Sequence, residues 1–387
     1  MKKKTLLAVI ALLSVTSLTG CKLFNRKNNN SNEQSQSGSG GSGDDYCPYE
    51  DGTAKNNKGT GTLFNEVIGY NTKDAAVIED EGVRYVVYAS NETERGKQVF
   101  AARKATLEGN KWVYGAKNIV LRGNENSWDK NIFNPSIIKG SFSYQGTSYK
   151  YLMAYNGNSS GDTNNHLGLA VTNDILSEWV RVGSKPILEN PEIYEASYGF
   201  GSPSLVSYDQ QGKGYLFYAV GETEVSFEAV RTYDFSNLDN PKLDPGYTSL
   251  PITGLTDKVE GFPVIMNAGF ALSKDGNSIY MVRDRLPQSM SKPNQTTEVE
   301  IAKASKTILN DLSLSWTVSD NITGMKTMDM EDEESLGWDE IYSGEFVTDA
   351  YGKLLDKNTA EVIYSTYDED ASAASYTATL AAYEVNL

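Results

Sequence analysis

The stretch that decides the fold opens with FNPSIIKG (Phe133–Gly140) and continues with YKYLMAYNG (Tyr149–Gly157) and HLGLAVTNDILSEWVRVGSKPIL (His166–Leu188). It contains short runs of β-branched and aromatic residues, and polar segments separate these runs. Runs of this kind are typical of β-strands. The stretch therefore predicts one small antiparallel sheet.

Four strands are expected in this sheet, and the segment Ser141–Thr147 with its Gly146 supplies the first turn. The expected strands are Ser136–Lys139, Tyr149–Tyr155, Leu167–Val171 and Trp179–Val182. A unit this small cannot cover its own apolar faces. The chain should therefore contain sister units that pack against it.

Four further segments share the pattern of this unit. Each begins with a small or acidic residue and a short apolar strand, and it continues through a turn into an aromatic-rich strand. With the template included, the units begin at Asp74, Asn134, Ser202, Asn267 and Asp349, at spacings of 60, 68, 65 and 82 residues. A four-stranded repeat of this length is typical of a propeller blade with long loops.

Five such units predict an all-β fold, namely a five-bladed β-propeller with four antiparallel strands in each blade. The propeller domain would span residues 46–387, and the C-terminal strand Tyr376–Val385 would close the ring. A β-sandwich is the alternative, although sandwiches seldom show a regular four-strand repeat. We expect the domain to be a monomer.

The N-terminus has the features of an export signal. Three lysines (Lys2–Lys4) precede an apolar run, Leu6–Leu13, that is too short to span a bilayer. The sequence Leu18-Thr19-Gly20-Cys21 then resembles the bacterial lipobox, which implies lipidation of Cys21 after removal of residues 1–20. Residues 21–45 are rich in Asn, Ser and Gly and should form a flexible tether. We therefore expect an exported, membrane-anchored lipoprotein; a signal cleaved without lipidation is the alternative.

Composition narrows the range of partners. With 39% hydrophobic residues, the chain can bury a core. The formal net charge is −16, and it becomes −19 when the three signal lysines are removed, which argues against nucleic acid and against direct adsorption to anionic lipid. Besides Cys21 the only cysteine is Cys47, so no disulfide can form within the propeller.

No cofactor is expected. His166 is the only histidine, which excludes a His-rich metal site, and we expect it to lie in a loop. The acidic run Asp329–Trp338 offers oxygen ligands for a structural Ca²⁺, but it lacks the spacing and turn glycine of an EF-hand. A solvated acidic loop is the alternative interpretation of this run.

The stretch Trp128–Leu188 resembles the repeat of the five-bladed glycosidases, which include glycoside hydrolase family 43 and its relatives in families 32, 68 and 130. The resemblance rests on NPSIIKG, on YKYLMAYNG and on GLAVTND followed by Trp179, and it is weaker at Asp74–Lys104 and Gly201–Ala219. It implies a pocket at the propeller axis that engages carbohydrate. A glycan or oligosaccharide is therefore the expected partner.

The resemblance also implies catalytic positions. Family 43 has an Asp base at the start of blade one, a second Asp that tunes the acid in blade two, and a Glu acid in blade three. Asp74 falls on the first position, whereas Asn134 and Gly201 fall on the other two. Hydrolysis with inversion needs two carboxyl groups roughly 6.5–9.5 Å apart. The standard acids are thus incomplete, and the chain is a glycoside hydrolase only if other carboxylates replace them.

Other carboxylates are candidates to reach the axis from loops. They are Asp129, Glu195 and Asp349, with Glu345, Glu298 and Glu300 as further options. An exposed loop charge is the alternative interpretation of each.

Several side chains are candidates for contact with sugar, because flat aromatic faces suit sugar rings. They are Trp128, Tyr198, Phe200 and Trp338, together with Asn134. Tyr155 and Trp179 should instead pack in the core.

These observations support three hypotheses. The first is a lipid-anchored extracytoplasmic propeller that binds or processes extracellular carbohydrate in a glycosidase-like pocket. The second is a surface scaffold without enzymatic activity, because a fold does not fix a function. The third is an active glycoside hydrolase whose carboxylates come from loops.

Overall fold

The computed structural model describes part of the compact unit Asp45–Leu387. The described residues are 59–63, 71–93, 96–109, 111–159, 164–190, 198–221, 226–256, 266–285, 298–311, 313–323, 340–367 and 378–387. Their regular structure is β-strand, apart from the 3-10 helix η2 (Lys306–Leu309). No helix in these segments has the length and apolar character that a membrane crossing requires.

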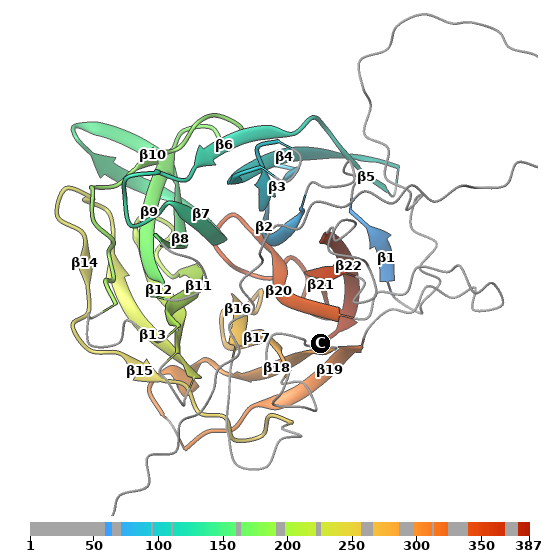
Figure 1. Ribbon diagram of the computed structural model, residues 1–387. Helices are drawn as coiled ribbons and strands as arrows, with labels where there is room; N and C mark the ends of the chain where they lie inside the picture. The colour runs from blue at the N-terminus through green and yellow to red at the C-terminus, as the bar shows by residue number, and fades with distance from the viewer. Residues whose placement is uncertain are drawn as a thin grey trace, which may run out of the picture. The chain divides into compact units, whose positions relative to one another are not determined.

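The strands form five antiparallel blades, whose colours run from blue for blade 1 to red for blade 5, apart from the blue strand β1 in blade 5 (Figure 1). Blade 1 contains β2 (Lys73–Asp80), β3 (Val83–Asn91), β4 (Gln98–Glu108), β5 (Lys111–Tyr114) and β6 (Asn118–Arg122). Blade 2 contains β7 (Asn131–Tyr144), β8 (Thr147–Asn158), β9 (His166–Thr172) and β10 (Val180–Arg181). Blade 3 contains β11 (Gly199–Ser207), β12 (Lys213–Gly221), β13 (Ser226–Asp234), β14 (Lys242–Leu243) and β15 (Thr248–Ser249). Blade 4 contains β16 (Met266–Leu272), β17 (Ser278–Asp284), β18 (Glu298–Ser305) and β19 (Thr317–Thr323). Blade 5 contains β20 (Glu340–Asp349), β21 (Thr359–Tyr367), β22 (Thr379–Asn386) and β1 (Gly59–Thr62).

The innermost strands of the five blades surround one axis. Strands β2, β7, β11, β16 and β20 are neighbours in this order, and β20 returns to β2 through a short parallel pairing of Val77 with Val347 (Figure 1). The prediction of an all-β, five-bladed propeller is confirmed. The blade that served as template, β7–β10, has the four strands that the sequence predicts.

The first turn of the template blade is tighter than expected. Strands β7 and β8 run on to a two-residue turn at Gln145 and Gly146, with φ of 50° and 75°. Positive φ at both central residues is typical of a type I′ hairpin turn, whose twist matches that of the flanking strands. The predicted turn at Ser141–Thr147 is therefore mostly strand, with an irregularity in the pairing between Lys139 and Phe142.

The ring is closed by strands from both ends of the propeller. Strand β22 pairs with β21 on one side and with β1 on the other, so the first described strand is the outermost strand of blade 5. The expected closing strand, Tyr376–Val385, corresponds to β22 and takes part in the closure as the third strand of its blade. The partner supplied by β1 was not predicted from the sequence, because GTGT is short and carries no apolar pattern.

The predicted start of the fifth blade is wrong. Its innermost strand is β20, and the position equivalent to Asp74 is Ser343 rather than Asp349. Asp349 is the last residue of β20. Its carboxylate accepts hydrogen bonds from the backbone N–H groups of Tyr351 and Lys353 at 2.8 and 2.9 Å. The pair Asp349-Ala350 has the same residue types as Asp74-Ala75. For this reason the sequence pattern places the start of the fifth blade six residues too late.

The core lies between the blades. Trp179 is buried in a cluster that joins blades 1 and 2, as expected, and its backbone N–H donates to the Val120 carbonyl at 2.9 Å. Phe217 of blade 3 stacks on Phe270 of blade 4 with ring centroids 4.1 Å apart. Each blade thus covers one apolar face of the next, which is why no single blade is expected to be stable alone.

Substitution of Trp179 by alanine should destabilise the propeller. Truncating a fully buried tryptophan costs about 3–5 kcal/mol of unfolding free energy, since a cavity replaces its contacts. The neighbouring Val180 is 44% exposed, so Val180→Ala is a matched control that should leave stability almost unchanged. Thermal and urea unfolding of the two variants would compare them, and equal stability would contradict the assigned role of Trp179.

Candidate functional site

Five equivalent residues, one from each blade, share an unusual backbone conformation at the axis. Their φ angles are positive: Asp74 51°, Asn134 44°, Ser202 45°, Asn267 45° and Ser343 52°. Positive φ is uncommon outside glycine. In every blade it coincides with an irregularity in the pairing of the first two strands, a position where bulges re-aim side chains. We call these five residues the axial positions.

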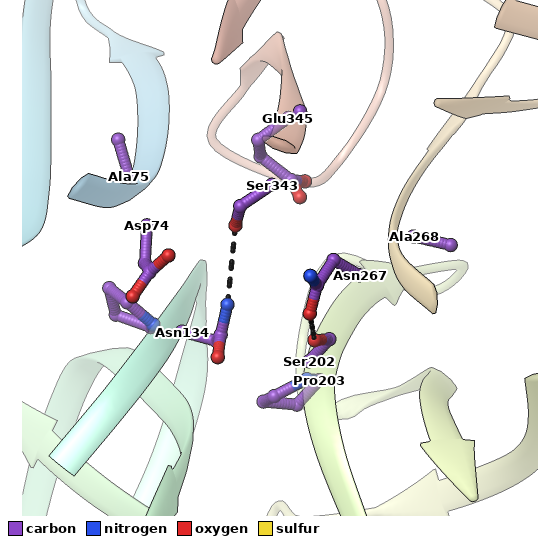
Figure 2. Close-up of a pocket in the computed structure, with 11 residues that line it drawn as sticks. Asp74, Ala75, Asn134, Ser202, Pro203, Asn267, Ala268, Ser343 and Glu345 are labelled. Atoms are coloured by element: carbon purple, nitrogen blue, oxygen red, sulfur yellow. Dashed lines mark hydrogen bonds between the residues drawn. The ribbon is translucent and has the colours of Figure 1, made fainter. Parts of the chain in front are cut away.

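The axial positions line a small pocket together with Glu345 and the residue that follows each of them (Figure 2). The following residues are Ala75, Pro135, Pro203, Ala268 and Gly344, which are small or compact and leave the axis open. The cavity volume is about 20 Å³, which is room for about one water molecule. The pocket can therefore admit a single polar group, and not a whole sugar ring.

Hydrogen bonds between blades hold the axial side chains in place. Asn134 Nδ2 donates to Ser343 Oγ at 3.2 Å, which links blades 2 and 5 across the front of blade 1 (Figure 2). Ser202 Oγ donates to Asn267 Oδ1 at 2.7 Å, which links blades 3 and 4. Two cross-blade pairs of amide and hydroxyl groups thus form part of the pocket wall.

Asp74 supplies a carboxylate to this wall. Its side chain is 5% exposed, and its backbone N–H donates to Ser365 Oγ of blade 5 at 2.9 Å. The Nζ of Lys73 lies 3.7 Å from Asp74 Oδ2, and it is also 5.6 Å from the centre of the Phe133 ring. The Lys73 ammonium group therefore forms an ion pair with the Asp74 carboxylate.

Glu345 supplies the second carboxyl group of the pocket. A Cβ atom added at Gly269 would lie 2.2 Å from Glu345 Oε2, so the glycine leaves the space that the glutamate side chain occupies. Burial raises the pKa of the Glu345 carboxyl well above its ordinary value. Glu345 was one of the further options from the sequence, and the structure brings it to the same pocket as Asp74.

Two buried acids lie behind the pocket wall, and neither was predicted from the sequence. Asp284, on β17, accepts the backbone N–H of Ser343 and the side-chain amide of Asn267, both at 2.7 Å. Burial raises the pKa of Asp284 to about 8, against the lowering effect of these two hydrogen bonds. Asp284 therefore holds the axial residues Asn267 and Ser343 in place through these hydrogen bonds.

Glu228, on β13, is fully buried. Neither of its carboxyl oxygens has a hydrogen-bond partner among the described residues. Burial raises the pKa of Glu228 well above its ordinary value, and the nearby Glu345 charge raises it further. Glu228 and Glu345 therefore form a pair of neighbouring carboxyl groups that favour the protonated form.

Tyr198 covers the place that the family resemblance gives to the catalytic acid. A Cβ atom at Gly201 would lie 2.2 Å from the Tyr198 hydroxyl oxygen, so any side chain at residue 201 would collide with the tyrosine. Burial raises the pKa of Tyr198 to about 12, which keeps the hydroxyl protonated. An acid at residue 201 is thus absent from the sequence and excluded by this packing.

Asp129 and Trp128 do not line the axial pocket. Asp129 is 1% exposed; its Oδ2 accepts Arg181 Nε at 2.6 Å and the Tyr155 hydroxyl at 3.0 Å. Trp128 stacks on Tyr155, with centroids 5.8 Å apart, and lies over Gly168. Both residues pack blade 2 instead, and Tyr155 is a core residue, as expected.

Three other candidates from the sequence also lie away from the pocket lining. Phe200 packs edge-on against Tyr218, with centroids 5.7 Å apart. Glu300 is fully buried and pairs with Arg283 at 2.9 Å, and Glu298 pairs with Arg285. These two glutamates carry out structural pairing in blade 4.

His166 is the first residue of β9 and not a loop residue. Its Nδ1 accepts the backbone N–H of Asn190 at 2.8 Å, and burial lowers its pKa. Its ring meets Trp128 edge-on, with centroids 6.0 Å apart. These contacts leave His166 in a packing role beside blade 2.

Several sequence predictions fall outside the described residues. They are the lipidation site Cys21, the acid Glu195, the aromatic Trp338 and the acidic run Asp329–Trp338 with its Ca²⁺ alternative. Within the described residues, no group of three or more His, Cys, Asp or Glu side chains has the geometry to hold a metal ion.

Comparisons with known proteins identify the fold. No protein-family model and no curated protein matches the sequence. Solved structures do match: the RGII complex of BT0996 has a TM-score of 0.54 at 15% identity, over 85% of this sequence and 91% of the matched protein. A thermostable family-43 glycoside hydrolase has a TM-score of 0.51 at 14% identity, over 82% and 90%. The catalytic domain of the Coprinopsis cinerea GH62 α-L-arabinofuranosidase has 0.52 at 11% identity, over 85% and 96%. The resemblance to five-bladed glycosidases is therefore confirmed at the level of the fold.

The buried Glu228 should make stability depend on pH. A folded-state pKa above the ordinary 4.5 means that the folded chain holds this proton more tightly than the unfolded chain. The stabilisation is full below the unfolded pKa and is lost as the pH rises through the folded value. Thermal stability should therefore fall as the pH rises above the ordinary carboxyl value of 4.5, and less steeply in Glu228→Gln.

The control for this measurement is Glu108→Gln, because Glu108 is exposed on blade 1. This variant should keep the pH slope of the wild type. A Glu228→Gln slope equal to that of the wild type would show that Glu228 is ionised in the folded protein at neutral pH. Glu345 titrates in the same direction, so a shallower slope, and not a flat one, is the expected result.

Proposed function

We propose that this chain is an extracytoplasmic protein that binds extracellular carbohydrate at the propeller axis. One observation carries the proposal: five polar side chains at equivalent positions, and a second carboxyl group at Glu345, converge on one pocket. Binding sites of this kind combine a concave surface with a few well-placed polar groups. The similarity in fold to a family-43 glycoside hydrolase and a GH62 arabinofuranosidase supports the same class of ligand.

The size of the pocket defines how the ligand is held. A cavity of about 20 Å³ accepts one hydroxyl group in place of one water molecule. The inserted hydroxyl donates to the Asp74 carboxylate and competes for the 3.2 Å hydrogen bond between Asn134 and Ser343. The remainder of the sugar rests on the rim of the pocket, so the axis recognises one end of a glycan.

The chain is anchored through a lipid on Cys21. The support is the lipobox-like Leu18-Thr19-Gly20-Cys21 after a basic and apolar start, and the polar tether of residues 21–45. A multiply acylated cysteine binds a membrane stably, because each buried methylene contributes about 0.8 kcal/mol. The tether holds the propeller away from the lipid surface, where it can reach extracellular glycan.

Replacement of Asn134 by alanine should weaken carbohydrate binding by roughly tenfold to a hundredfold. The variant lacks the amide that the ligand hydroxyl would meet in the pocket, and a buried polar group without a partner costs about 1–3 kcal/mol. The wild-type propeller without residues 1–45 is screened first on a glycan array, and titration calorimetry then quantifies the best glycan. Asn124→Ala is the control, since Asn124 is exposed. A folded wild type that is silent across a broad array, or equal affinities of both variants, would exclude the axial site.

Substitution of Cys21 by alanine should release the full-length chain from the membrane. The acyl chains supply the membrane affinity in this proposal, and the polar tether supplies none. Metabolic labelling with an alkyne fatty acid should mark the wild type and not Cys21→Ala, and fractionation should move the variant to the soluble fraction. Membrane association that survives the substitution would refute the lipid anchor.

A further inference from the structure

We propose that the axial pocket binds a primary ammonium group, so that the carbohydrate recognised at the axis is an amino sugar with a free amine. This inference rests on the proposed function and names the chemical class of its ligand. The pocket volume of about 20 Å³ admits one small polar group. An ammonium group is close to a hydroxyl group in size, but it differs in charge and in hydrogen bonding, and both differences favour it at this axis.

The pocket lining offers hydrogen-bond acceptors to such a group. An ammonium group has three N–H donors and no acceptor. Asp74 and Glu345 bring two carboxyl groups to the lining, from blades 1 and 5 (Figure 2). Among the described residues, none donates a hydrogen bond to the Glu345 carboxyl group. The Asp74 carboxylate has an ion pair with Lys73 at 3.7 Å. Both carboxyl groups can therefore accept hydrogen bonds from a ligand.

Three side-chain donors of the lining have partners within the protein. Asn134 Nδ2 donates to Ser343 Oγ at 3.2 Å, and Ser202 Oγ donates to Asn267 Oδ1 at 2.7 Å. Asn267 Nδ2 donates to Asp284, behind the wall, at 2.7 Å. The two prolines of the lining have no backbone N–H. The lining therefore suits a ligand group that only donates, and an ammonium group brings three donors where a hydroxyl group brings one.

Glu228 adds a carboxyl group without a partner behind the lining. Glu228 pairs with Ala219, and Ala219 pairs with Gly201, so the three residues lie in one row on one face of blade 3. Because the two inner members of the row have no side chain beyond a methyl group, the Glu228 side chain can extend toward the axis. It is fully buried, and neither of its carboxyl oxygens has a hydrogen-bond partner among the described residues. A buried carboxylate in this position needs a positive charge beside it.

The acids around the axis lie close enough to affect one another. Burial raises the pKa of Tyr198 to about 12, and the charges of Asp74, Glu228 and Asp284 add to this rise. The charge of Glu345 acts in the same way on Glu228, whose pKa burial already raises. We call these four carboxyl groups the axial acids.

The positive charge near the axial acids is incomplete. Lys73 pairs with Asp74, and Arg283 favours the ionised form of Asp284, although the ion pair of Arg283 at 2.9 Å is with Glu300. Burial raises the pKa of the other two axial acids well above the ordinary value, and no positive charge among the described residues lowers either. A cationic ligand group therefore complements the axis better than a neutral one.

Binding of the ammonium group should be coupled to the release of protons. Its positive charge favours the ionised forms of Glu228 and Glu345, the axial acids that burial otherwise keeps protonated. Titration calorimetry in two buffers that differ in ionisation enthalpy measures this release. A neutral sugar of the same shape should release none.

The experiment titrates the full-length chain, purified in detergent, with matched oligosaccharides. The probes are hexamers of glucosamine, of glucose and of N-acetylglucosamine, which differ only in the group on one ring carbon, and the same three forms in the galactose series. The free-amine hexamer of at least one series should bind about tenfold to a hundredfold more tightly than its hydroxyl and N-acetyl counterparts, because hydrogen bonds to charged groups contribute more than neutral ones.

Three variants test whether the preference arises at the axis. Glu345→Gln keeps the shape of the side chain and removes its charge, so it should reduce the preference for the amine to less than about threefold. Asp74→Asn should reduce it in the same way. Glu384→Gln is the matched control, because Glu384 is exposed on the same blade as Glu345 and its loss lowers the net negative charge equally. Thermal unfolding checks that each variant is folded.

The outcomes separate this inference from the proposed function. Equal binding of the amine, hydroxyl and N-acetyl forms would overturn the inference and leave carbohydrate binding intact. A preference for the amine that survives in both Glu345→Gln and Asp74→Asn would also overturn it, since the attraction would then come from the acidic surface as a whole. Binding of a lysine-rich peptide without binding of any amino sugar would overturn it in favour of a protein ligand. A wild type that binds no glycan would overturn both proposals.

Discussion

The structure depends on a left-handed backbone conformation that recurs once in each blade. At the five axial positions the first strand leaves its regular pairing for one or two residues and then resumes it. This irregularity turns a polar side chain toward the axis while its neighbours continue in the sheet. Because an uncommon φ has a conformational cost, hydrogen bonds between blades, such as Asn134–Ser343 and Ser202–Asn267, must hold it. The positive-φ irregularity near the start of each blade therefore also forms the pocket.

Arg84 and Arg283 form ion pairs with acids that do not line the axial pocket. Arg283 forms an ion pair with Glu300. Arg84 forms ion pairs with Glu79 of blade 1 and with Glu361 of blade 5. Among the acids at or behind the pocket, Asp74 has the nearby Lys73, and Asp284 relies on hydrogen bonds from neutral groups. Burial raises the pKa of both Glu228 and Glu345, and the nearby Glu345 charge raises that of Glu228 further.

The sequence predicted the parts of the site that repeat. Asp74, Asn134, Ser202 and Asn267 were identified as equivalent starts, and each has the shared positive φ at the axis. The fifth start was displaced to Asp349, because Ser343-Gly344-Glu345 lacks the proline or alanine that marks the other four. The sequence does not indicate that Asp284 and Glu228 lie near the axis. They lie on the second and third strands of their blades, and the residue pattern there predicts a β-strand but no position relative to the axis. The sequence predicts Tyr198 as an aromatic contact for sugar, and only the structure shows that its ring packs over Gly201.

The amino-acid sequence by itself determined the all-β class, the number of blades and most of the axial positions, because each is a local pattern repeated along the chain. Only the tertiary structure decided which carboxyl groups share a pocket. Glu345 reaches Gly269 across a blade boundary, Asn134 reaches Ser343 across the axis, and β1 completes a blade with β22 from the other end of the chain. These contacts join residues that are 76 to more than 200 positions apart, and no local periodicity records them. The physical reason is closure: a ring brings the starts of all five blades to one point, and side chains that are independent in sequence then become neighbours.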